Sequence, residues 1–367
     1  MSRIFKKING HKIEINNADK ELFPEDGITK GEVVDYYGRI AETMLPYMKD
    51  RPLALQRFPD GIDEEGFYQK EAADYFPDFI ETARVVLEDG SKQNEIVCNN
   101  ATTLVYLANL AVITPHLWQS STEAIRMPDK IVFDLDPSDD DFAVVKEGAR
   151  DLRKALEDMG LTCFVMTTGS RGLHVACPIK PEHEYESVKS FTKAVAQNLE
   201  AEDPKFTTKV RKEKRRGRVF IDYLRNEYAQ TSVAPYALRA KPGAPVAAPL
   251  DWDELSDSKL DAQSYTMENI FKRLGRREDP WKDFSRHRAS LPELDELSEA
   301  ERIKDESATL SFSSEESFSH GFCARARNPF ANGTHGPGTR FPEFKGIPLR
   351  AASIKNDANA LIGMTMF

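Results

Sequence analysis

Asp134 and Asp136 interrupt the otherwise apolar run "IVFDLDPSD" at residues 131–139. Side chains alternate between the two faces of a β-strand, so carboxylates spaced by two residues project on the same side. Like charges at this distance repel unless a cation lies between them, and open oxygen ligands are what Mg²⁺ or Mn²⁺ uses in phosphoryl chemistry. The spacing predicts a metal platform. The alternative is a strand end whose acids cap the turn "DPSDD".

A third acid, Asp222, lies in the apolar strand "VFIDYLRN". Burying an unpaired carboxylate in such a strand is costly, so packing alone does not explain this acid, and it is the third candidate carboxylate of the site. The strand follows the run "KFTTKVRKEKRRGR", residues 205–218, which holds eight Lys and Arg against one Glu in a chain of net charge -10. This local positive patch matches a polyanion better than a small ligand. A solvated basic loop is the alternative.

The turn "TGSRG" at residues 168–172 joins two predicted strands, "LTCFVMT" and "LHVACPI". It carries Ser170 and Arg171, and His174 lies on the strand that follows. Glycines let backbone N–H groups approach an anion, and Arg and His add charge-assisted bonds to phosphate oxygens. A predicted helix over 142–160 completes a β–α–β–β arrangement, which could bring the turn next to the Asp pair. A purely structural glycine hairpin is the alternative.

A second candidate anion site lies near the N-terminus. Thr29 and Glu32 form a capping-box pattern at the start of a predicted amphipathic helix. Asn17, Lys20 and Lys30 surround the turn before that helix. Free N–H groups and two lysines at a helix N-terminus are suited to a phosphate. Two solvated lysines in a loop are the alternative.

Aromatic residues follow in the stretch "RPLALQRFPDGIDEEGFYQK". Phe67 and Tyr68 lie near Arg57 and Lys70, a combination that could stack a base above a cation bound to the backbone. An aromatic pair of the core is the alternative. The next segment, "NNATTLVYLANLAVIT", predicts a buried helix that leads into a polar loop carrying His116.

Composition sets outer limits. With 367 residues, 40% of them hydrophobic and 30% charged, two domains or subdomains are expected. No apolar stretch approaches the ~20 residues of a membrane helix and the start lacks the apolar core of a signal peptide, so we expect a soluble, cytoplasmic protein without membrane contact. The four cysteines form no C-x-x-C pair, which argues against a zinc ribbon or a disulfide framework.

The end of the chain differs in composition. "LPELDELSEAERIKDE" predicts an exposed acidic helix. Beyond Ser307 the chain is rich in Ser, Gly, Asn and Pro without periodicity, which predicts a disordered tail or a reading-frame artefact.

Four motifs occur in a fixed order: "VFDLDP", "TTGSRGLHV", "GRVFIDYLRN" and "APYALRAKPGAPVAAPLDWDEL". Together with "DKELFPEDGITKGEVVDYY", "QRFPDGIDEEGFYQK" and "HLWQSS", they resemble the polymerase domain of bacterial ligase D and its stand-alone relatives, in the archaeo-eukaryotic primase superfamily. The resemblance covers about residues 10–285. It implies a mixed α/β (α+β) catalytic fold of antiparallel sheets flanked by helices.

The resemblance divides the chain into an N-terminal subdomain with 5′-phosphate and DNA-binding elements (1–115), a catalytic primase-polymerase subdomain (116–290) and a C-terminal part outside the match (291–367). It also implies site roles for individual residues. By this resemblance, two divalent ions (Mn²⁺ or Mg²⁺) would bind to Asp134, Asp136 and Asp222, and the incoming NTP or dNTP would bind to Ser170, Arg171, His174 and Arg239. A DNA 5′-phosphate would bind to Asn17, Lys20 and Lys30. Phe67 would stack on the DNA, and His116 would lie near the primer or the metal.

The implied activity is addition of nucleotides, often ribonucleotides with Mn²⁺, to 3′-hydroxyl ends at gaps and double-strand breaks in non-homologous end joining. The implied partners are DNA with gaps or broken ends, a Ku-type end binder and an ATP-dependent DNA ligase. A replicative primase-type enzyme and a non-catalytic DNA-end-binding module are the alternatives.

Two features depart from the family pattern. The chain has no K-x-D-G motif and no room for a ligase domain, so we expect a stand-alone or excised polymerase. Ala237 replaces the usual Ser, which weakens the expectation of a ribose preference.

Overall fold

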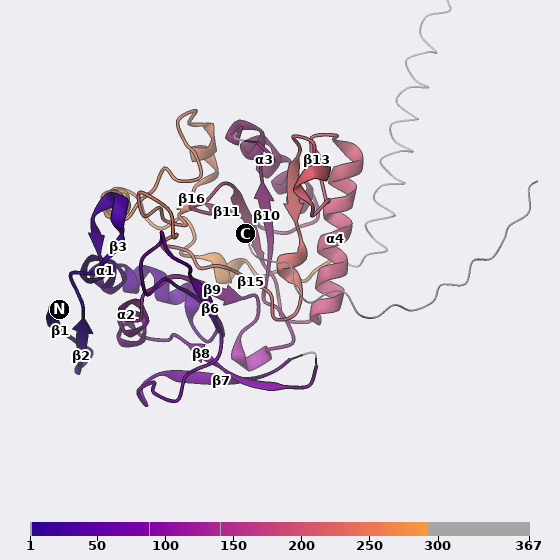
Figure 1. Ribbon diagram of the computed structural model, residues 1–367. Helices are drawn as coiled ribbons and strands as arrows, with labels where there is room; N and C mark the ends of the chain where they lie inside the picture. The colour runs from indigo at the N-terminus through magenta and orange to yellow at the C-terminus, as the bar shows by residue number, and fades with distance from the viewer. Residues whose placement is uncertain (1, 88, 140, 293–367) are drawn as a thin grey trace, which may run out of the picture. The chain divides into compact units, whose positions relative to one another are not determined.

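A computed structural model describes residues 2–87, 89–139 and 141–292 (Figure 1). These residues belong to one unit that spans 1–304. The acidic helix expected near the C-terminus and the tail after Ser307 lie outside the described residues. None of the described helices is both long and apolar enough to cross a membrane.

The helices of this unit are α-helices and short 3-10 turns. The α-helices are α1 (Lys30–Met48), α2 (Ala101–Asn109), α3 (Phe142–Asp158), α4 (Tyr185–Glu202) and α5 (Ile270–Leu274). The 3-10 turns are η1 (Pro24–Asp26), η2 (Thr122–Ala124), η3 (Lys212–Lys214), η4 (Leu224–Asn226), η5 (Trp252–Ser256) and η6 (Phe284–His287).

Two sheets dominate the fold. A six-stranded sheet has the order β13-β14-β10-β12-β11-β16, and a four-stranded sheet has the order β15-β9-β5-β6. Their strands are β5 (Leu53–Arg57), β6 (Phe67–Gln69), β9 (Val112–Trp118), β10 (Lys130–Asp136), β11 (Phe164–Thr167), β12 (Leu173–Pro178), β13 (Phe206–Thr207), β14 (Val219–Asp222), β15 (Thr231–Val233) and β16 (Pro249–Leu250). Three hairpins complete the set: β1 (Arg3–Ile8) with β2 (His11–Asn16), β3 (Glu21–Phe23) with β4 (Ile28–Thr29), and β7 (Glu81–Val86) with β8 (Lys92–Val97).

The two faces of β10 belong to different cores. Ile131, Phe133 and Leu135 pack in one apolar cluster with buried residues of α3 and α4. Val132 belongs instead to the cluster that contains α1, α2 and the four-stranded sheet. Because side chains alternate along a strand, Asp134 and Asp136 share the Val132 face. The expected same-side projection of the two acids therefore occurs, and it points them towards the space between the two sheets. This mixed α/β architecture with antiparallel sheets matches the expected fold class.

Helix α1 forms as its sequence predicts. Thr29 accepts a hydrogen bond from the Glu32 backbone N–H, and the Glu32 side chain accepts one from the Thr29 N–H, so the capping box is complete. Tyr36, Tyr37 and Ile40 on its apolar face are buried. This cap fixes where the helix starts, and thereby places Lys30 at its first turn.

The structure differs from the sequence prediction after α2. The predicted helix was longer, but α2 ends at Asn109 and Ala111 takes a left-handed φ of 57°. The chain then enters β9, so His116 lies in a strand and not in a polar loop. This segment forms a strand and not the end of a helix because it pairs on both sides, with β5 and with β15.

The predicted boundary between residues 115 and 116 falls inside β9. Strand β15 returns from the C-terminal side to pair with β9, and buried residues between 233 and 284 join the N-terminal core cluster. The two cores therefore do not follow the chain order, since long-range strand pairing is not encoded in local sequence patterns.

Candidate active site

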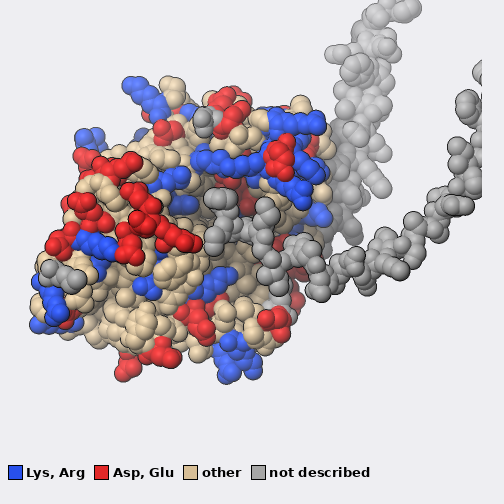
Figure 2. All heavy atoms as spheres, viewed as in Figure 1, with Lys and Arg blue, Asp and Glu red and all other residues tan. Residues whose placement is uncertain are grey.

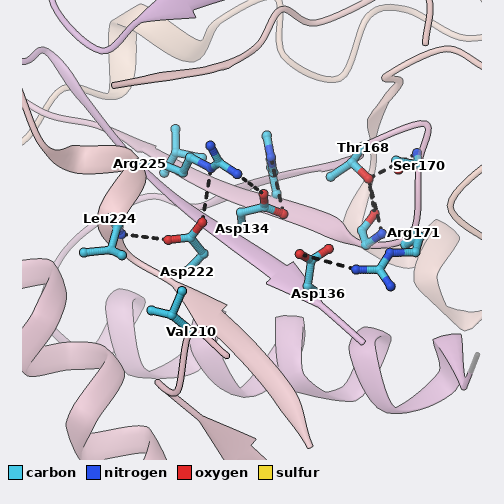
Figure 3. A network of polar contacts seen from close by, with 12 residues as sticks. Asp134, Asp136, Thr168, Ser170, Arg171, Val210, Asp222, Leu224 and Arg225 are labelled. Carbon is cyan, nitrogen blue, oxygen red and sulfur yellow. Dashed lines mark hydrogen bonds and ion pairs between the residues drawn. The ribbon is translucent and has the colours of Figure 1, made fainter. Parts of the chain in front are cut away.

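Asp134 lies at the centre of the six-stranded sheet, with a candidate site residue on each side. In the antiparallel register, Asp134 is opposite Asp222 of β14 and opposite His174 of β12. Residues directly opposite each other in antiparallel strands project on the same face. The structure thus brings together three side chains that are far apart in the chain, and Asp136 lies two residues further along the same face (Figure 3).

Two arginines and a histidine lie beside these acids, and Figure 3 labels the two arginines. Arg225 spans two carboxylates, with Nε 3.3 Å from Asp222 Oδ2 and Nη2 3.6 Å from Asp134 Oδ2. Arg171 Nη2 is 3.9 Å from Asp136 Oδ2, and His174 Nε2 is 3.5 Å from Asp134 Oδ1. In the described part of the chain, no three His, Cys, Asp or Glu side chains gather into a metal-ligating cluster. The arginines balance the acids instead.

The three acids differ in how readily they ionise. Burial opposes ionisation of Asp134, but His174, Arg225 and Arg239 outweigh it and hold its pKa below the usual value. Burial and the charge of Asp134 raise the pKa of Asp136 to about 6. Burial also raises the pKa of Asp222, which Arg225 only partly offsets. Asp134 is therefore the fixed negative charge, and the other two acids would gain most from an added cation.

Arg225 is held in place by its neighbour Asn226. The buried Asn226 amide accepts from the Val132 N–H at 2.9 Å and donates to the Val132 carbonyl at 2.8 Å. Asp222 Oδ1 accepts from the Leu224 N–H at 3.0 Å. These bonds fix the η4 turn against β10, so the guanidinium lies over the paired acids.

The "TGSRG" turn closes tightly against the same strand. A Cβ on Gly172 would lie 1.9 Å from the Leu135 carbonyl oxygen, so no side chain fits there. Gly169 has a φ of +63°, and its Cβ would meet the Arg239 side chain at 2.7 Å. Arg239 Nη1 donates to the Thr168 carbonyl at 3.0 Å. Ser170, Arg171 and Arg239 therefore gather at one end of the Asp pair, as the sequence predicted for the turn.

His116 also joins this site, from the opposite sheet. Burial and the charges of Arg239 and Arg225 hold its pKa well below the usual value, so the imidazole is neutral. Its Nε2 is buried without a hydrogen-bond partner among the residues that the structure describes. The ring of Tyr68 packs edge-on at 5.7 Å. The site therefore has one wall from each sheet.

The N-terminal cations form a second cluster. Lys20 Nζ is 2.5 Å from Asp60 Oδ1, and Lys30 Nζ donates to the Asn109 carbonyl at 3.2 Å. Burial lowers the pKa of Lys30, and the positive charge of Lys20 lowers it further. Asn17 shapes the preceding turn with a left-handed φ of 54°, and its carbonyl accepts from the Lys20 N–H at 3.0 Å.

Strand β6 carries two aromatic side chains with different neighbours. Phe67 is opposite Arg57, whose guanidinium lies 5.1 Å from the ring centroid. Arg57 Nε donates to the Leu110 carbonyl at 3.0 Å, next to the Asn109 carbonyl that Lys30 contacts. Phe67 therefore packs beside Arg57, whereas Tyr68 packs against His116. Both rings are about half exposed.

The basic run predicted from the sequence lies between β13 and β14. Its exposed members are Lys209, Arg211, Lys212, Lys214 and Arg216, and Figure 2 shows basic side chains gathered on the surface around β13. Its one buried member, Arg215, donates to the backbone carbonyls of residues 209 and 210. Arg215 Nη1 has no hydrogen-bond partner among the described residues. Burial lowers the pKa of Arg215, and the charge of Asp136 opposes this effect in part.

Residues 29–281 match the family model of the LigD primase-polymerase domain. The chain belongs to this family. It is 35% identical over 308 residues to the multifunctional non-homologous end joining DNA repair protein LigD of Mycobacterium tuberculosis H37Rv, covering 81% of this chain and 40% of that protein. It is 32% identical over 284 residues to the bifunctional LigD of Bacillus subtilis, covering 77% and 45% respectively. The chain spans less than half the length of these two relatives.

A solved structure, the polymerase domain from Mycobacterium tuberculosis ligase D in complex with DNA, matches the fold. The TM-score is 0.70 at 31% identity, over 76% of this chain and 99% of that one. The predicted family resemblance and fold class are therefore confirmed.

Sequence reasoning missed two side chains of this LigD primase-polymerase domain, Arg225 and Lys241. The pKa of Lys241 is lowered by burial and by the charges of Arg239 and Arg171. Arg225 lies three residues after Asp222, and Lys241 lies two residues after Arg239, so closeness in sequence to a predicted site residue could have indicated both. Ala237, which departs from the family pattern, is fully buried in the core next to the site.

Proposed function

We propose that this chain is a primase-polymerase that adds nucleotides, ribonucleotides preferentially, to 3′-hydroxyl ends at gaps and double-strand breaks in non-homologous end joining. The observation that carries the proposal is the placement of Asp134 between Asp222 and His174, with Arg225 beside Asp134 and Asp222 and Arg171 beside Asp136. Family membership supports the reaction class, and the solved relative in complex with DNA supports DNA as the partner.

The three carboxylates would hold two divalent ions, Mn²⁺ or Mg²⁺. Their oxygens are the hard donors that such ions require, and Asp134 Oδ1 is buried without a hydrogen-bond partner among the described residues. Arg225 contacts both Asp134 and Asp222, and it would have to release one of these contacts when the ions bind. When bound, the ions would activate the attacking hydroxyl and neutralise charge on the transferred phosphate.

The chain's own cations would bind the triphosphate. Arg171, His174 and Arg239 lie around the turn that carries Ser170, and Lys241 adds a further positive charge near Arg171 and Arg239. Charge-assisted bonds to phosphate oxygens are roughly twice as strong as neutral ones. The neutral His116 would accept a hydrogen bond from a nucleotide or primer hydroxyl, since its Nε2 has no hydrogen-bond partner among the described residues.

The N-terminal cluster would read the 5′-phosphate of the downstream strand. Lys20 and Lys30 supply two positive charges, and Asn17 shapes the turn that precedes Lys20. Phe67 would stack on the DNA beside this phosphate, while Tyr68 on the same strand faces the reaction site. One short strand would thus set the distance between the bound 5′-end and the growing 3′-end. A Ku-type end binder and an ATP-dependent ligase are the proposed protein partners.

The test is primer extension on a gapped duplex, with and without a 5′-phosphate, comparing ATP with dATP in Mn²⁺, Mg²⁺ or chelator. We expect metal-dependent extension that is faster with ATP and with the phosphate. The variant Asp134→Ala/Asp136→Ala should lose extension by at least ~1,000-fold while still binding DNA. Asp139→Ala is the matched control, because this neighbouring acid is exposed and pairs with no cation among the described residues.

The outcomes separate the alternatives. DNA binding without extension by the wild-type chain would favour a non-catalytic end binder. Extension that needs no primer would favour a replicative primase-type enzyme. Full activity of the double Asp variant would refute the assignment of the metal ligands.

A further inference from the structure

A cavity of about 390 Å³ lies beside the candidate active site. Val132, His174, Ala176 and Met166 line it, and all four are on the face of the six-stranded sheet that carries Asp134. Val233 of β15 lines the opposite side. The cavity therefore continues the active-site space between the two sheets, and its volume lies in the range of roughly 300–1,000 Å³ that small-molecule sites usually have.

The far end of this cavity carries an excess of positive charge. Arg51 and Arg288 both bind the one buried carboxylate of Asp129, at 2.7 Å each. Lys130 lies at the same end, is only 8% exposed, and its ammonium makes no hydrogen bond or ion pair to a described residue. Asp129 is the one buried acid beside these three bases, and the whole lining carries five Lys and Arg against three Asp and Glu. A buried cation without a full counter-charge is costly.

Burial and the charge of Arg51 hold the Lys130 pKa well below its usual value, and Asp129 compensates only in part. A second negative charge in the cavity would satisfy this amine.

The middle of the cavity is apolar and aromatic. Trp281 and Phe284 stack with ring centroids 5.1 Å apart at an interplanar angle of 13°, and both line the cavity. Val132, Met166 and Val233 supply the rest of this wall. Such a surface favours a flat apolar body. Inorganic phosphate or pyrophosphate alone would leave it uncovered.

The cavity is separate from the residues assigned to the nucleotide and the metals. Asp134, Asp136 and Asp222 do not line it, nor do Ser170, Arg171 and Arg239. His174 is the shared wall: its Nε2 faces Asp134 at 3.5 Å while its ring lines the cavity. An occupant would therefore touch the side chain that contacts the central acid.

We propose that this cavity is a binding site for a small aromatic anion, with its anionic group against Lys130 and Arg51 and its ring against Trp281. The phosphate of a nucleoside monophosphate and the carboxylate of an aromatic acid share this chemistry. The inference does not depend on the proposed polymerase activity, because binding can be measured on the protein alone.

The experiment uses 8-anilino-1-naphthalenesulfonate, an aromatic anion whose fluorescence rises in apolar surroundings, with energy transfer from tryptophan as the readout. We expect saturable binding of one molecule to the full wild-type chain. Lys130→Met should weaken it at least ~10-fold, because the side chain keeps its length but loses its charge. Lys193→Met is the matched control, since Lys193 is exposed on α4 away from the cavity. Equal binding by wild type and Lys130→Met would overturn the proposal.

A second variant guards against a folding defect. Ser285 is exposed and lines the cavity, so Ser285→Trp should narrow its mouth and weaken probe binding by a similar factor. Unchanged binding by a folded Ser285→Trp variant, checked by circular dichroism, counts against the site. Competition identifies the anionic group: displacement of the probe by AMP or by 1-naphthoate, at concentrations where adenosine and inorganic phosphate have no effect, supports the proposal. Displacement by phosphate alone, or by none of the four, overturns it.

Discussion

The buried acid Glu95 on β8 gives a quantitative test of the electrostatics. Its side chain is fully buried, and neither carboxyl oxygen reaches hydrogen-bond geometry with a described donor. Burial raises the pKa of Glu95 from 4.5 to about 7, which Lys70 and the nearby Trp118 indole only partly offset. We predict that this one group makes the fold more stable in mild acid than in mild base.

The sign follows from proton linkage. A carboxyl whose pKa is higher in the folded chain than in the unfolded chain binds its proton more tightly when folded. Its contribution to the free energy of unfolding is therefore complete below the unfolded pKa of 4.5 and is lost as the pH rises through about 7. At about 1.4 kcal/mol per pKa unit, the loss is about 3 kcal/mol. Glu95→Gln removes the titration, so this variant should be more stable than wild type at about pH 8 by up to that amount.

Urea unfolding followed by circular dichroism at about pH 5 and about pH 8 measures the effect. Subtracting the Glu95→Gln profile from that of wild type cancels the other titrating groups. Glu71→Gln is the control, because Glu71 forms the β-bridge opposite Glu95 but is exposed. A difference between wild type and Glu95→Gln that does not change with pH would refute the reasoning.

Three further predictions concern the candidate sites. Lys20→Ala/Lys30→Ala should abolish any gain in DNA affinity from a downstream 5′-phosphate, most visibly at low salt, as measured by fluorescence anisotropy; a surviving gain would mean that another site reads the phosphate. Arg225→Met should lower the free energy of unfolding in chelator by about 1–2 kcal/mol, a value discounted for the partial exposure of Arg225, because the charges of Asp134 and Asp222 then lack a cationic partner. Thermal melts should show that Mn²⁺ stabilises this variant more than it stabilises wild type, and equal stabilisation of the two would contradict the prediction. Ala237→Ser should cost about 1 kcal/mol in thermal unfolding and leave the ATP-to-dATP ratio in primer extension unchanged, because the added hydroxyl enters the closed core; a changed ratio would show that the position reaches the nucleotide.

Some of the site could be predicted because it depends on local rules. Period-two alternation placed Asp134 and Asp136 on one strand face, and the Thr29 capping box fixed the start of α1 and therefore Lys30. The two glycines of "TGSRG" indicated a tight turn, and the structure shows that no side chain fits at Gly172. Each of these features is determined within a few residues of chain.

The rest was decided by contacts between segments distant in sequence. Asp222 lies opposite Asp134 only because β14 pairs with β10. His116 reaches the site only because β9 pairs with β5 and β15 in the second sheet. Arg225 is directed onto the acids by the bonds between Asn226 and Val132. The amino-acid sequence by itself determined which residues can carry the chemistry. Only the tertiary structure decided which of them face one another, because strand pairing and burial act between elements that no local pattern connects.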